Sequence, residues 1–577
     1  MAIKASAPLD ILKALYRTMV MSREVDLIEQ EYTGRGEAVF HVSGAGHEAS
    51  AALSPFLGPQ DWLHCHYRDK ALMMARGIAP QQFFLALFNK DGSHSRGRQM
   101  NAHMSCPQLR ILSLVGPVGN SALQAVGVAN AVKGDADQPV VLCSLGDGMT
   151  QQGEVLEALA HAVRETLPVL FLVQDNKLAI STSTTAKTFY QTPAGDASEF
   201  YGIPIHRING RYPQTCLETF ATLVAAMRKD RSPAIVVMDV DRLHSHTNAD
   251  DQRIYRSVGE LEQVKESGDP IVNLEIWLKA QGVPEDSFAG LGDSLRADLK
   301  IQASLAQRSL EPSPTRTALK PLPPTLEDPS SEYRGSPSAT GEDNLVMLEA
   351  IREVLRKRMS EDERITLFGE DLEDPKGDVF GLTKGLSTTF PGRVRNSPLA
   401  EATIVGVSIG EALAGRRPVA FLQFADFLPI AYNQIVSELG SMHWRTDGGW
   451  EAPVIVMVTC GGYKPGLGPF HASSYEALAV HTPGVDVFMP STAGDAAGLL
   501  NAAFESGRPT LFFYPKSCLN DRDNATSCDV EKQLIPLGRA RTVRQGKDVT
   551  LVGYGNTVRL CLQAAAALSS QGAQAEV

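Results

Sequence analysis

The sequence predicts an α/β protein with two doubly wound parallel sheets, followed by a truncated third α/β domain. Three observations support this prediction. Short apolar runs of strand length alternate with helical patterns, which is typical of parallel sheets with buried strands. The alternation occurs on both sides of one long proline-rich segment. The chain, at 577 residues, is also too long for a single hydrophobic core.

The first half of the chain begins with an amphipathic helix at residues 9–32, and several of its polar residues are acids. Buried parallel strands are expected at 140–145, 169–174 and 234–240, with a helix at 154–165 between the first two. A strand–helix–strand unit of this kind is the repeating element of a doubly wound sheet.

The second half repeats this arrangement after a segment that has little to bury. Residues 311–344 combine proline with serine, threonine and charge, which favours an extended linker. Strands are expected beyond it at 365–368, 419–424, 454–459 and 510–514, each near a helical pattern.

The C-terminal segment predicts a strand at 548–554, a helix at 557–571 and the first residues of another strand at 575–577. We therefore expect this last domain to be incomplete. The expected division is a first domain at 1–310, a linker at 311–341, a second domain at 342–533 and the truncated domain at 534–577.

Composition excludes several classes of protein. A net charge of −12 argues against a nucleic-acid or membrane-surface partner, and no apolar run is long enough to span a bilayer. The acids of the first helix also argue against a transit peptide. The eight cysteines are scattered without a CxxC pair, which favours a reduced, cytoplasmic protein without structural zinc.

Polar segments follow the first two strands of the first sheet. Gly146-Asp147-Gly148-Met149 comes after one strand, and Asp175-Asn176-Lys177-Leu178 comes after the next. Because the carboxyl ends of adjacent parallel strands lie side by side, the side chains of Asp147 and Asn176 can converge. Magnesium prefers oxygen ligands, and a carboxylate, an amide oxygen and a backbone carbonyl would leave room for diphosphate oxygens and water.

Each segment alone is more often a turn that ends a strand. Together, at the ends of neighbouring strands, Asp147 and Asn176 favour a magnesium–diphosphate site, and Gly146 and Gly148 permit the close backbone approach that it needs.

This pattern resembles that of the thiamine diphosphate enzymes, and the resemblance covers nearly the whole chain. Residues 10–310 resemble the α subunit of a 2-oxo acid dehydrogenase decarboxylating component, and residues 342–577 resemble its β subunit. The family often has Asn-Asn where this chain has Asp175-Asn176, but Asn176 is the position that the resemblance assigns to magnesium. The stretches at 97–103, 179–182 and 250–258 lean toward the branched-chain members.

The resemblance also implies site residues in the first half. It places Tyr67 and Arg68 at the diphosphate and the backbone carbonyl of Leu178 at magnesium. The full cofactor-binding set that it implies is Tyr67, Arg68, Gly116, Val118, Gly146, Asp147, Gly148, Met149, Asn176, Leu178 and His246, with Glu401 and Phe427 from the second half. His41 and His246 match active-site histidines of the family, although a single histidine is more often structural. The loop at 243–251 is expected to order over bound cofactor.

In the second half, the resemblance makes Glu401 the carboxyl group that activates the cofactor through a ring nitrogen. A buried, partly protonated acid suits this role, although a glutamate at a helix N-terminus is ordinarily a capping partner. Phe427 takes the position of the aromatic residue that stacks on the pyrimidine, and its alternative is core packing. His471 matches a histidine implicated in proton transfer or substrate binding.

The resemblance implies an oxidoreductase that decarboxylates a 2-oxo acid, preferably a branched-chain one, and transfers the acyl group to the lipoyl group of a partner acyltransferase. It implies thiamine diphosphate and Mg²⁺ as cofactors and a homodimer as the assembly of a fused α–β chain. Pyruvate and acetoin dehydrogenase components stay open, as do a non-oxidative ketol-transferase and an inactive assembly module.

Overall fold

The strands predicted in the first half form a six-stranded sheet in the computed structural model, which describes residues 9–313 and 320–577. The sheet order is β1-β2-β3-β10-β9-β8, and all neighbours run parallel except β8 at one edge. The strands are β1 (Trp62–His64), β2 (Val141–Gly146), β3 (Val169–Asp175), β8 (Glu199–Phe200), β9 (Ile203–Asn209) and β10 (Ala234–Asp239). The three predicted strands therefore lie within a residue or two of their expected bounds.

The register of this sheet determines where the polar segments lie. Gly146, the last residue of β2, is the partner of Gln174 on β3. Asp147 and Asn176, which follow these two strands, therefore leave the same edge of the sheet from neighbouring positions. The short strands β4 (Leu178–Ala179) and β5 (Thr182–Ser183) then pair antiparallel, so the chain after Asn176 turns back on itself.

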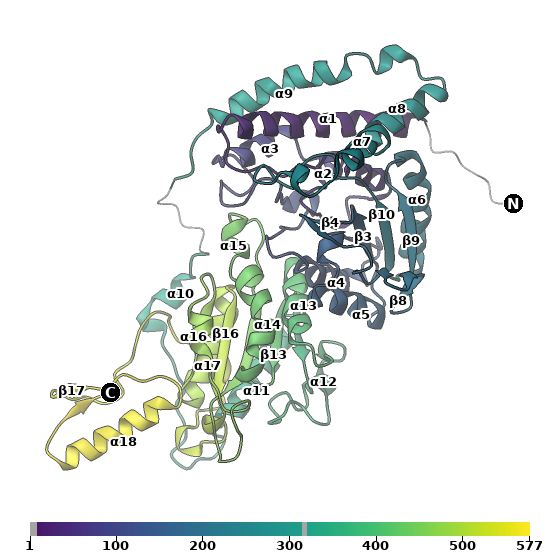
Figure 1. The fold of residues 1–577 in the computed structure, drawn as a ribbon. Coiled ribbons are helices and arrows are strands. Elements are labelled where there is room, and N and C mark those ends of the chain that lie inside the picture. The colour runs from purple at the N-terminus through teal and green to yellow at the C-terminus, as the bar shows by residue number, and fades with distance from the viewer. Residues whose placement is uncertain (1–8, 314–319) are drawn as a thin grey trace. The chain divides into compact units, whose positions relative to one another are not determined.

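Helices cover the first sheet and form a separate layer beside it. Helix α4 packs on β1, β2 and β3, and α6 packs on β9. The long helix α1 (Leu9–Gly34), predicted at 9–32, lies alongside α9 and also packs on α2 and α8 (Figure 1). The other helices of this half are α2 (Lys70–Arg76), α3 (Pro80–Leu87), α4 (Ser121–Val132), α5 (Gly153–Arg164), α6 (Pro213–Asp230), α7 (Val258–Ser267), α8 (Pro270–Ala280) and α9 (Leu291–Gln307).

The chain divides into two compact units, and one short segment from the second half of the sequence belongs to the first unit. The first unit also includes Met442–Trp450, with helix α15 (Met442–Arg445). This short segment packs within the first unit, where Arg98 and Arg96 pair with Asp447.

The second unit contains another six-stranded sheet, and all of its strands are parallel. Its order is β12-β11-β13-β14-β16-β15. The strands are β11 (Ile365–Gly369), β12 (Val394–Asn396), β13 (Arg417–Leu422), β14 (Ile455–Cys460), β15 (Asp486–Phe488) and β16 (Thr510–Pro515). The predicted fold class, with parallel sheets in both halves, is therefore confirmed.

The helices of the second unit are mostly buried against this sheet. Every residue of α13 (Glu401–Leu413) is buried, and α11 (Met347–Glu361) packs on α17 (Ala493–Ser506). The shorter helices are α12 (Leu386–Thr389), α14 (Leu428–Asn433) and α16 (Glu476–Val480).

The described part of the proline-rich segment is not a free linker. After residue 320 it forms α10 (Pro324–Glu327), with Leu326 fully buried, and Tyr333 then bridges to Leu534. Residues 314–319 of the predicted linker lie outside the described residues. At the C-terminus, α18 (Thr557–Ser570) agrees with the predicted helix, and the predicted strands are shorter: β17 (Val549–Thr550) pairs parallel with β18 (Ala575–Glu576).

Over the described ranges, none of the helices is both long and apolar enough to cross a bilayer.

Candidate active site

A cavity lies at the carboxyl edge of the first sheet, where β1, β2 and β3 end. Segments that are far apart in the sequence line it. They contribute His66, Tyr67, Arg68, Val118, Gly146, Asp147, Gly148, Met149, Asn176, Leu178, Ala179, Ile180 and His246. The structure therefore brings together ten of the eleven first-half residues that the sequence assigns to the cofactor.

Asp147 and Asn176 supply oxygen atoms to this cavity. The Asp147 carboxylate is 4% exposed and accepts a hydrogen bond from the Thr184 hydroxyl, with 2.6 Å between the oxygens. Burial raises the pKa of Asp147, and the Thr184 bond opposes that rise. The Asn176 side-chain oxygen accepts from the backbone N–H of Leu178 at 3.1 Å, which holds it beside the start of β4.

The orientation of the Asn176 amide is set by His47, which sequence reasoning missed. Burial, followed by the charge of Arg68, lowers the pKa of His47 to about 3, so its ring is neutral. Its Nδ1 lies 2.9 Å from the Gln174 side-chain oxygen, and its Nε2 lies 3.4 Å from the Asn176 amide nitrogen. A neutral ring that donates to Gln174 can accept from Asn176, which leaves the Asn176 oxygen toward Leu178.

Asp175, which stands where the family often has asparagine, has a raised pKa. Burial, followed by the charge of Asp147, raises the pKa of Asp175 to about 6. Its carboxylate accepts from the N–H of Lys177 at 2.9 Å, so it shapes the turn after β3.

Arg68 connects the cavity to the loop that carries His246. Its guanidinium donates to the Ser43 carbonyl and lies 3.0 Å from Nδ1 of His246. Burial, followed by the charge of Arg68, lowers the pKa of His246 to about 4, so this histidine is a neutral acceptor near pH 7. The Tyr67 ring lies 5.2 Å from the Arg68 guanidinium carbon. These contacts hold the Arg68 guanidinium at the cavity, and a guanidinium has further N–H groups of the kind that phosphate oxygens accept.

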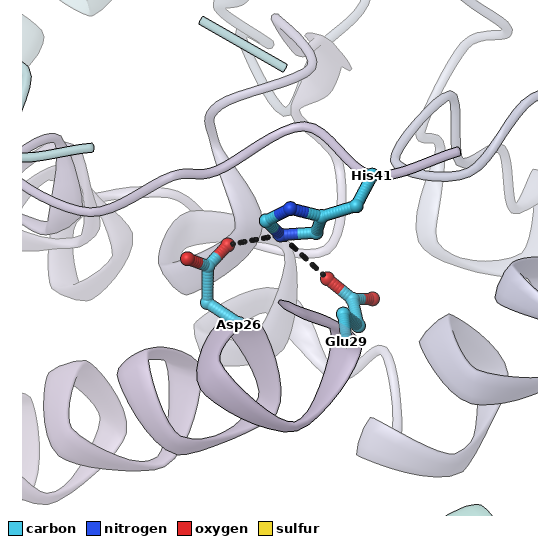
Figure 2. Close-up of side chains that lie close together, drawn as sticks. All are labelled: Asp26, Glu29 and His41. Atoms are coloured by element: carbon cyan, nitrogen blue, oxygen red, sulfur yellow. Dashed lines mark hydrogen bonds and ion pairs between the residues drawn. The ribbon is translucent and has the colours of Figure 1, made fainter. Parts of the chain in front are cut away.

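Two predicted residues lie apart from the lining. Gly116 is exposed and is not among the residues that line the cavity. His41 is 2% exposed and lies against Asp26 and Glu29 of α1, as Figure 2 shows. Its backbone belongs to the segment that reaches Arg68 through Ser43, so its connection to the cavity is indirect.

The residues present suit a magnesium-bound diphosphate. The Nε2 atom of His66 is buried, lies at the cavity and has no hydrogen-bond partner within residues 9–313 or 320–577. A Cβ on Gly148 would lie 2.7 Å from the Cβ of Ala179, so only glycine permits this approach. The carboxylate and amide oxygens match the ligands that magnesium prefers. Sequence reasoning assigned no role to His66, although it directly precedes Tyr67 and Arg68, and it missed Thr184 because folding rather than a motif places that residue at Asp147.

In the second unit, the side chains of Phe427 and His471 lie close together. Their ring centroids are 5.9 Å apart, and the Phe424 ring lies 4.9 Å from His471. The buried Lys516 ammonium donates to the His471 carbonyl at 2.8 Å and lies 4.7 Å from the Phe424 ring centre. The loop before His471 thus has a fixed end.

Glu401 begins helix α13 and is 8% exposed. The charge of Glu401 acts on Glu370, which follows β11. Burial, followed by the charges of Glu401 and Asp371, raises the pKa of Glu370 to about 7. Two carboxyl groups that influence each other in this way tend to share a proton.

Comparison with known proteins covers nearly the whole chain. Residues 16–314 match the dehydrogenase E1 component family, residues 343–521 match the transketolase pyrimidine-binding domain, and residues 538–577 match the transketolase C-terminal domain.

Individual relatives match the second half. The 2-oxoisovalerate dehydrogenase subunit beta of Bacillus subtilis (strain 168) is 39% identical over 231 residues, which are 40% of this chain and 69% of that protein. The 3-methyl-2-oxobutanoate dehydrogenase subunit beta of Mycobacterium tuberculosis (strain CDC 1551 / Oshkosh) is 39% identical over 38% of this chain and 63% of its own length. The pyruvate dehydrogenase E1 component subunit beta of Acholeplasma laidlawii is 35% identical over 40% of this chain and 70% of that protein.

The fold and these family matches place the protein in the class of thiamine diphosphate-dependent oxidoreductases. Since the first match spans more than half of the chain, the protein belongs to the dehydrogenase E1 component family, the 2-oxo acid dehydrogenases, with α-like and β-like parts in one chain. The expected resemblance is confirmed. Relatives named for branched-chain 2-oxo acids, pyruvate and acetoin all match, so the chain is similar to enzymes of all three substrate classes.

Proposed function

We propose that this protein catalyses the oxidative decarboxylation of a 2-oxo acid, with a branched-chain 2-oxo acid favoured, and passes the acyl group to a lipoyl group on a partner acyltransferase. The observation that carries the proposal is the convergence of Asp147, Asn176 and Arg68 on one cavity at the ends of parallel strands.

Magnesium and diphosphate binding would be the task of the first unit. The Asp147 carboxylate, the Asn176 amide oxygen and the Leu178 carbonyl would hold Mg²⁺, with diphosphate oxygens and water completing its octahedron. Arg68 would donate paired hydrogen bonds to the diphosphate, and Tyr67 packs beside it. Gly116 and Val118 would offer backbone atoms to the aminopyrimidine.

Bound thiamine diphosphate supplies a nucleophilic carbon and a ring that holds negative charge after carbon dioxide leaves. Glu401 would donate a hydrogen bond to a ring nitrogen, which requires a protonated carboxyl group in a dry site. Glu370, whose pKa is raised to about 7, would stabilise that proton by sharing it. Phe427 would stack on the pyrimidine.

The histidines would handle protons and polar atoms of the substrate. His246 is neutral near pH 7 because its pKa is lowered to about 4, so it would accept a hydrogen bond rather than pair with an anion. His471 lies at the end of a glycine-rich loop, where it would reach the substrate or the lipoyl arm. His41 would act from behind the cavity, by holding the segment that contacts Arg68.

A branched-chain substrate is supported by the first relatives, which are named for 2-oxoisovalerate and 3-methyl-2-oxobutanoate. The proposal includes a lipoyl-bearing acyltransferase as the partner and, because α-like and β-like parts are fused in one chain, a homodimeric assembly. The eight free cysteines suit a reducing compartment, so we place the protein in the cytoplasm.

The test is a panel of 2-oxo acids with dichlorophenolindophenol as electron acceptor, with thiamine diphosphate and Mg²⁺ present. Branched-chain acids should be the best substrates, and Glu401→Gln should lose about 100-fold or more of the activity. The matched control is Glu411→Gln, at the other end of α13, where the carboxylate pairs with Arg395. This control should lose stability but keep activity per folded molecule.

Activity that survives Glu401→Gln would contradict the assignment of the acid. Acyl transfer to sugar phosphates but not to lipoamide would favour a non-oxidative ketol-transferase. Failure of the wild-type protein to turn over any 2-oxo acid would favour an assembly module that has kept only its cofactor contacts.

A further inference from the structure

Asp26 of α1 lies at the centre of a buried polar network behind the cavity. Its side chain is 1% exposed, yet its two oxygens accept bonds from five groups. The donors are His41 Nε2 at 3.1 Å, Ser43 Oγ at 2.6 Å, the Gly44 N–H at 3.0 Å, Lys70 Nζ at 2.8 Å and Gln30 Nε2 at 3.0 Å. One carboxylate thus joins α1 to two separate segments of the chain.

The same neighbourhood has the outline of a metal site. Ligand atoms of Asp26, Glu29 and His41 all lie within 4.8 Å of one another. Figure 2 shows the three side chains pointing toward one another. However, the Lys70 ammonium bonds to both Asp26 and Glu29. A positive charge already lies between the carboxylates, and it would repel a metal cation at short range. The cluster is therefore better explained as an ion network that contains its own cation.

Charge within the network favours an ionised Asp26. Burial alone would raise the pKa of Asp26, but the charges of Lys70 and His41 outweigh it and hold that pKa well below its usual value. An ionised carboxylate can only accept hydrogen bonds, and all five contacting groups can donate. The geometry and the charge of this residue therefore agree.

The network reaches the cavity through Arg68 from two directions. The Ser43 hydroxyl donates to Asp26, and the Ser43 carbonyl accepts from the Arg68 guanidinium. Lys70, two residues after Arg68 in the chain, also donates to Asp26. These three hydrogen bonds and the covalent chain from Arg68 to Lys70 close a ring, which restricts Arg68 more than a single contact would.

The loop that carries His246 is attached to the same segment. The His41 N–H donates to the Asn248 side-chain oxygen at 3.0 Å, and the Asn248 N–H donates to the His41 carbonyl at 3.2 Å. Arg68 also lies 3.0 Å from Nδ1 of His246. A displacement of the 41–44 segment would therefore shift both the guanidinium and this histidine.

We propose that Asp26 is a positioning residue that fixes Arg68 and His246 for diphosphate binding through Ser43, His41 and Lys70. The inference rests on the proposed function, because it assumes that a diphosphate is what Arg68 and His246 bind. Asp26 itself touches neither substrate nor cofactor. Its effect is on the placement of the residues that do.

The experiment compares Asp26→Asn with Glu24→Gln in the full chain. Glu24 is also a buried acid of α1, and it pairs with Arg296 away from the 41–44 segment. Asp26→Asn keeps the shape of the side chain but removes its negative charge and replaces one acceptor oxygen with a donor nitrogen. The bonds to the 41–44 segment and to Lys70 must therefore weaken or rearrange. We expect Mg²⁺-dependent binding of thiamine diphosphate to weaken on the order of tenfold or more, with Glu24→Gln within about twofold of wild type.

A second readout does not depend on cofactor binding. Histidine-selective ¹⁵N labelling, with signals assigned by His41→Gln and His246→Gln, should show both histidine signals shifted by Asp26→Asn and unshifted by Glu24→Gln. Unshifted signals in Asp26→Asn would overturn the proposal even if cofactor binds. A wild-type protein that does not bind thiamine diphosphate would refute the proposed function, while the histidine signals would still decide the role of Asp26.

The double variant Asp26→Asn with Lys70→Met separates position from stability. It removes opposite charges together, so it should unfold at a higher temperature than Lys70→Met alone, yet bind cofactor as weakly as Asp26→Asn. Recovery of cofactor binding along with stability would show a purely structural role and overturn the proposal. A stoichiometric metal ion that stays in the purified protein after thiamine diphosphate is removed, and that is lost in Asp26→Asn, would overturn the ion-network explanation as well.

Discussion

The hydroxyl of Thr184 offers a sharp test of the candidate magnesium site. The variant Thr184→Val keeps the shape of the side chain and removes only its donor. In the protein this donor lies 2.6 Å from a carboxylate oxygen of Asp147, and both side chains are buried. Water has little access to replace the lost bond, so the carboxylate must bear the change.

The size of the effect follows from the charge of the acceptor. A hydrogen bond to a charged group contributes about 1.5–3 kcal/mol, which corresponds to about 10- to 150-fold in an equilibrium constant. The Thr184 bond lowers the pKa of Asp147, and burial raises it. Without the bond the pKa rises further, so protons compete more strongly with Mg²⁺ for this carboxylate.

The assay is a Mg²⁺ titration at fixed thiamine diphosphate, followed by isothermal calorimetry or intrinsic fluorescence at several pH values. Thr184→Val should raise the Mg²⁺ concentration at half saturation by about 10- to 100-fold, an effect that grows as the pH falls. Thr184→Ser keeps the hydroxyl and is the matched control, expected within about threefold of wild type. Equal behaviour of the valine and serine variants would refute the reasoning.

Three further predictions concern other parts of the site. Arg68→Lys keeps the charge but replaces the two spaced guanidinium nitrogens that contact the Ser43 carbonyl and His246 with a single nitrogen. Calorimetry should therefore show an affinity for thiamine diphosphate that is lower by about tenfold. An unchanged affinity would exclude Arg68 as a paired donor. Lys516→Met removes the donor to the His471 carbonyl, so amide hydrogen exchange across residues 461–474 should speed up, unlike in the exposed control Lys532→Met. Glu370, with a pKa raised from 4.5 to about 7, binds its proton more tightly in the folded state, so the stability that this proton contributes is complete below pH 4.5 and is lost as the pH rises toward 7. Glu370→Gln should therefore flatten the fall of the thermal unfolding midpoint between pH 4.5 and pH 7. An unaltered slope would count against the raised pKa.

The sheets and the metal-binding segment were predictable because their signals are local. Fully buried parallel strands such as β2 and β3 are continuous apolar runs, and Asp147 and Asn176 follow them directly. Strand β9 gave no such signal. It is only partly buried, contains Pro204 and lies next to the short antiparallel strand β8, so its sequence does not resemble a buried strand.

The residues that support the site could not be predicted because long-range folding places them. Thr184 reaches Asp147 only because β4 and β5 pair and turn the chain back, with Ile180 at a positive φ of 58° between them. His47 reaches Asn176 from a segment far away in the sequence. Resemblance to a family supplied Glu401, Phe427 and His471, whereas Glu370 and Lys516 emerged from the structure alone.

The burial of Lys70 between two acids has a consequence for how the first unit assembles. Lys70 begins α2, and its partners Asp26 and Glu29 belong to α1. An ammonium or a carboxylate buried without its partner costs several kcal/mol, so neither helix can reach its final place before the other. Docking of the two helices should therefore be a single cooperative event. The N-terminal helix is then an obligatory part of the folding unit, and its local detachment should require the β1–α2 segment to open with it.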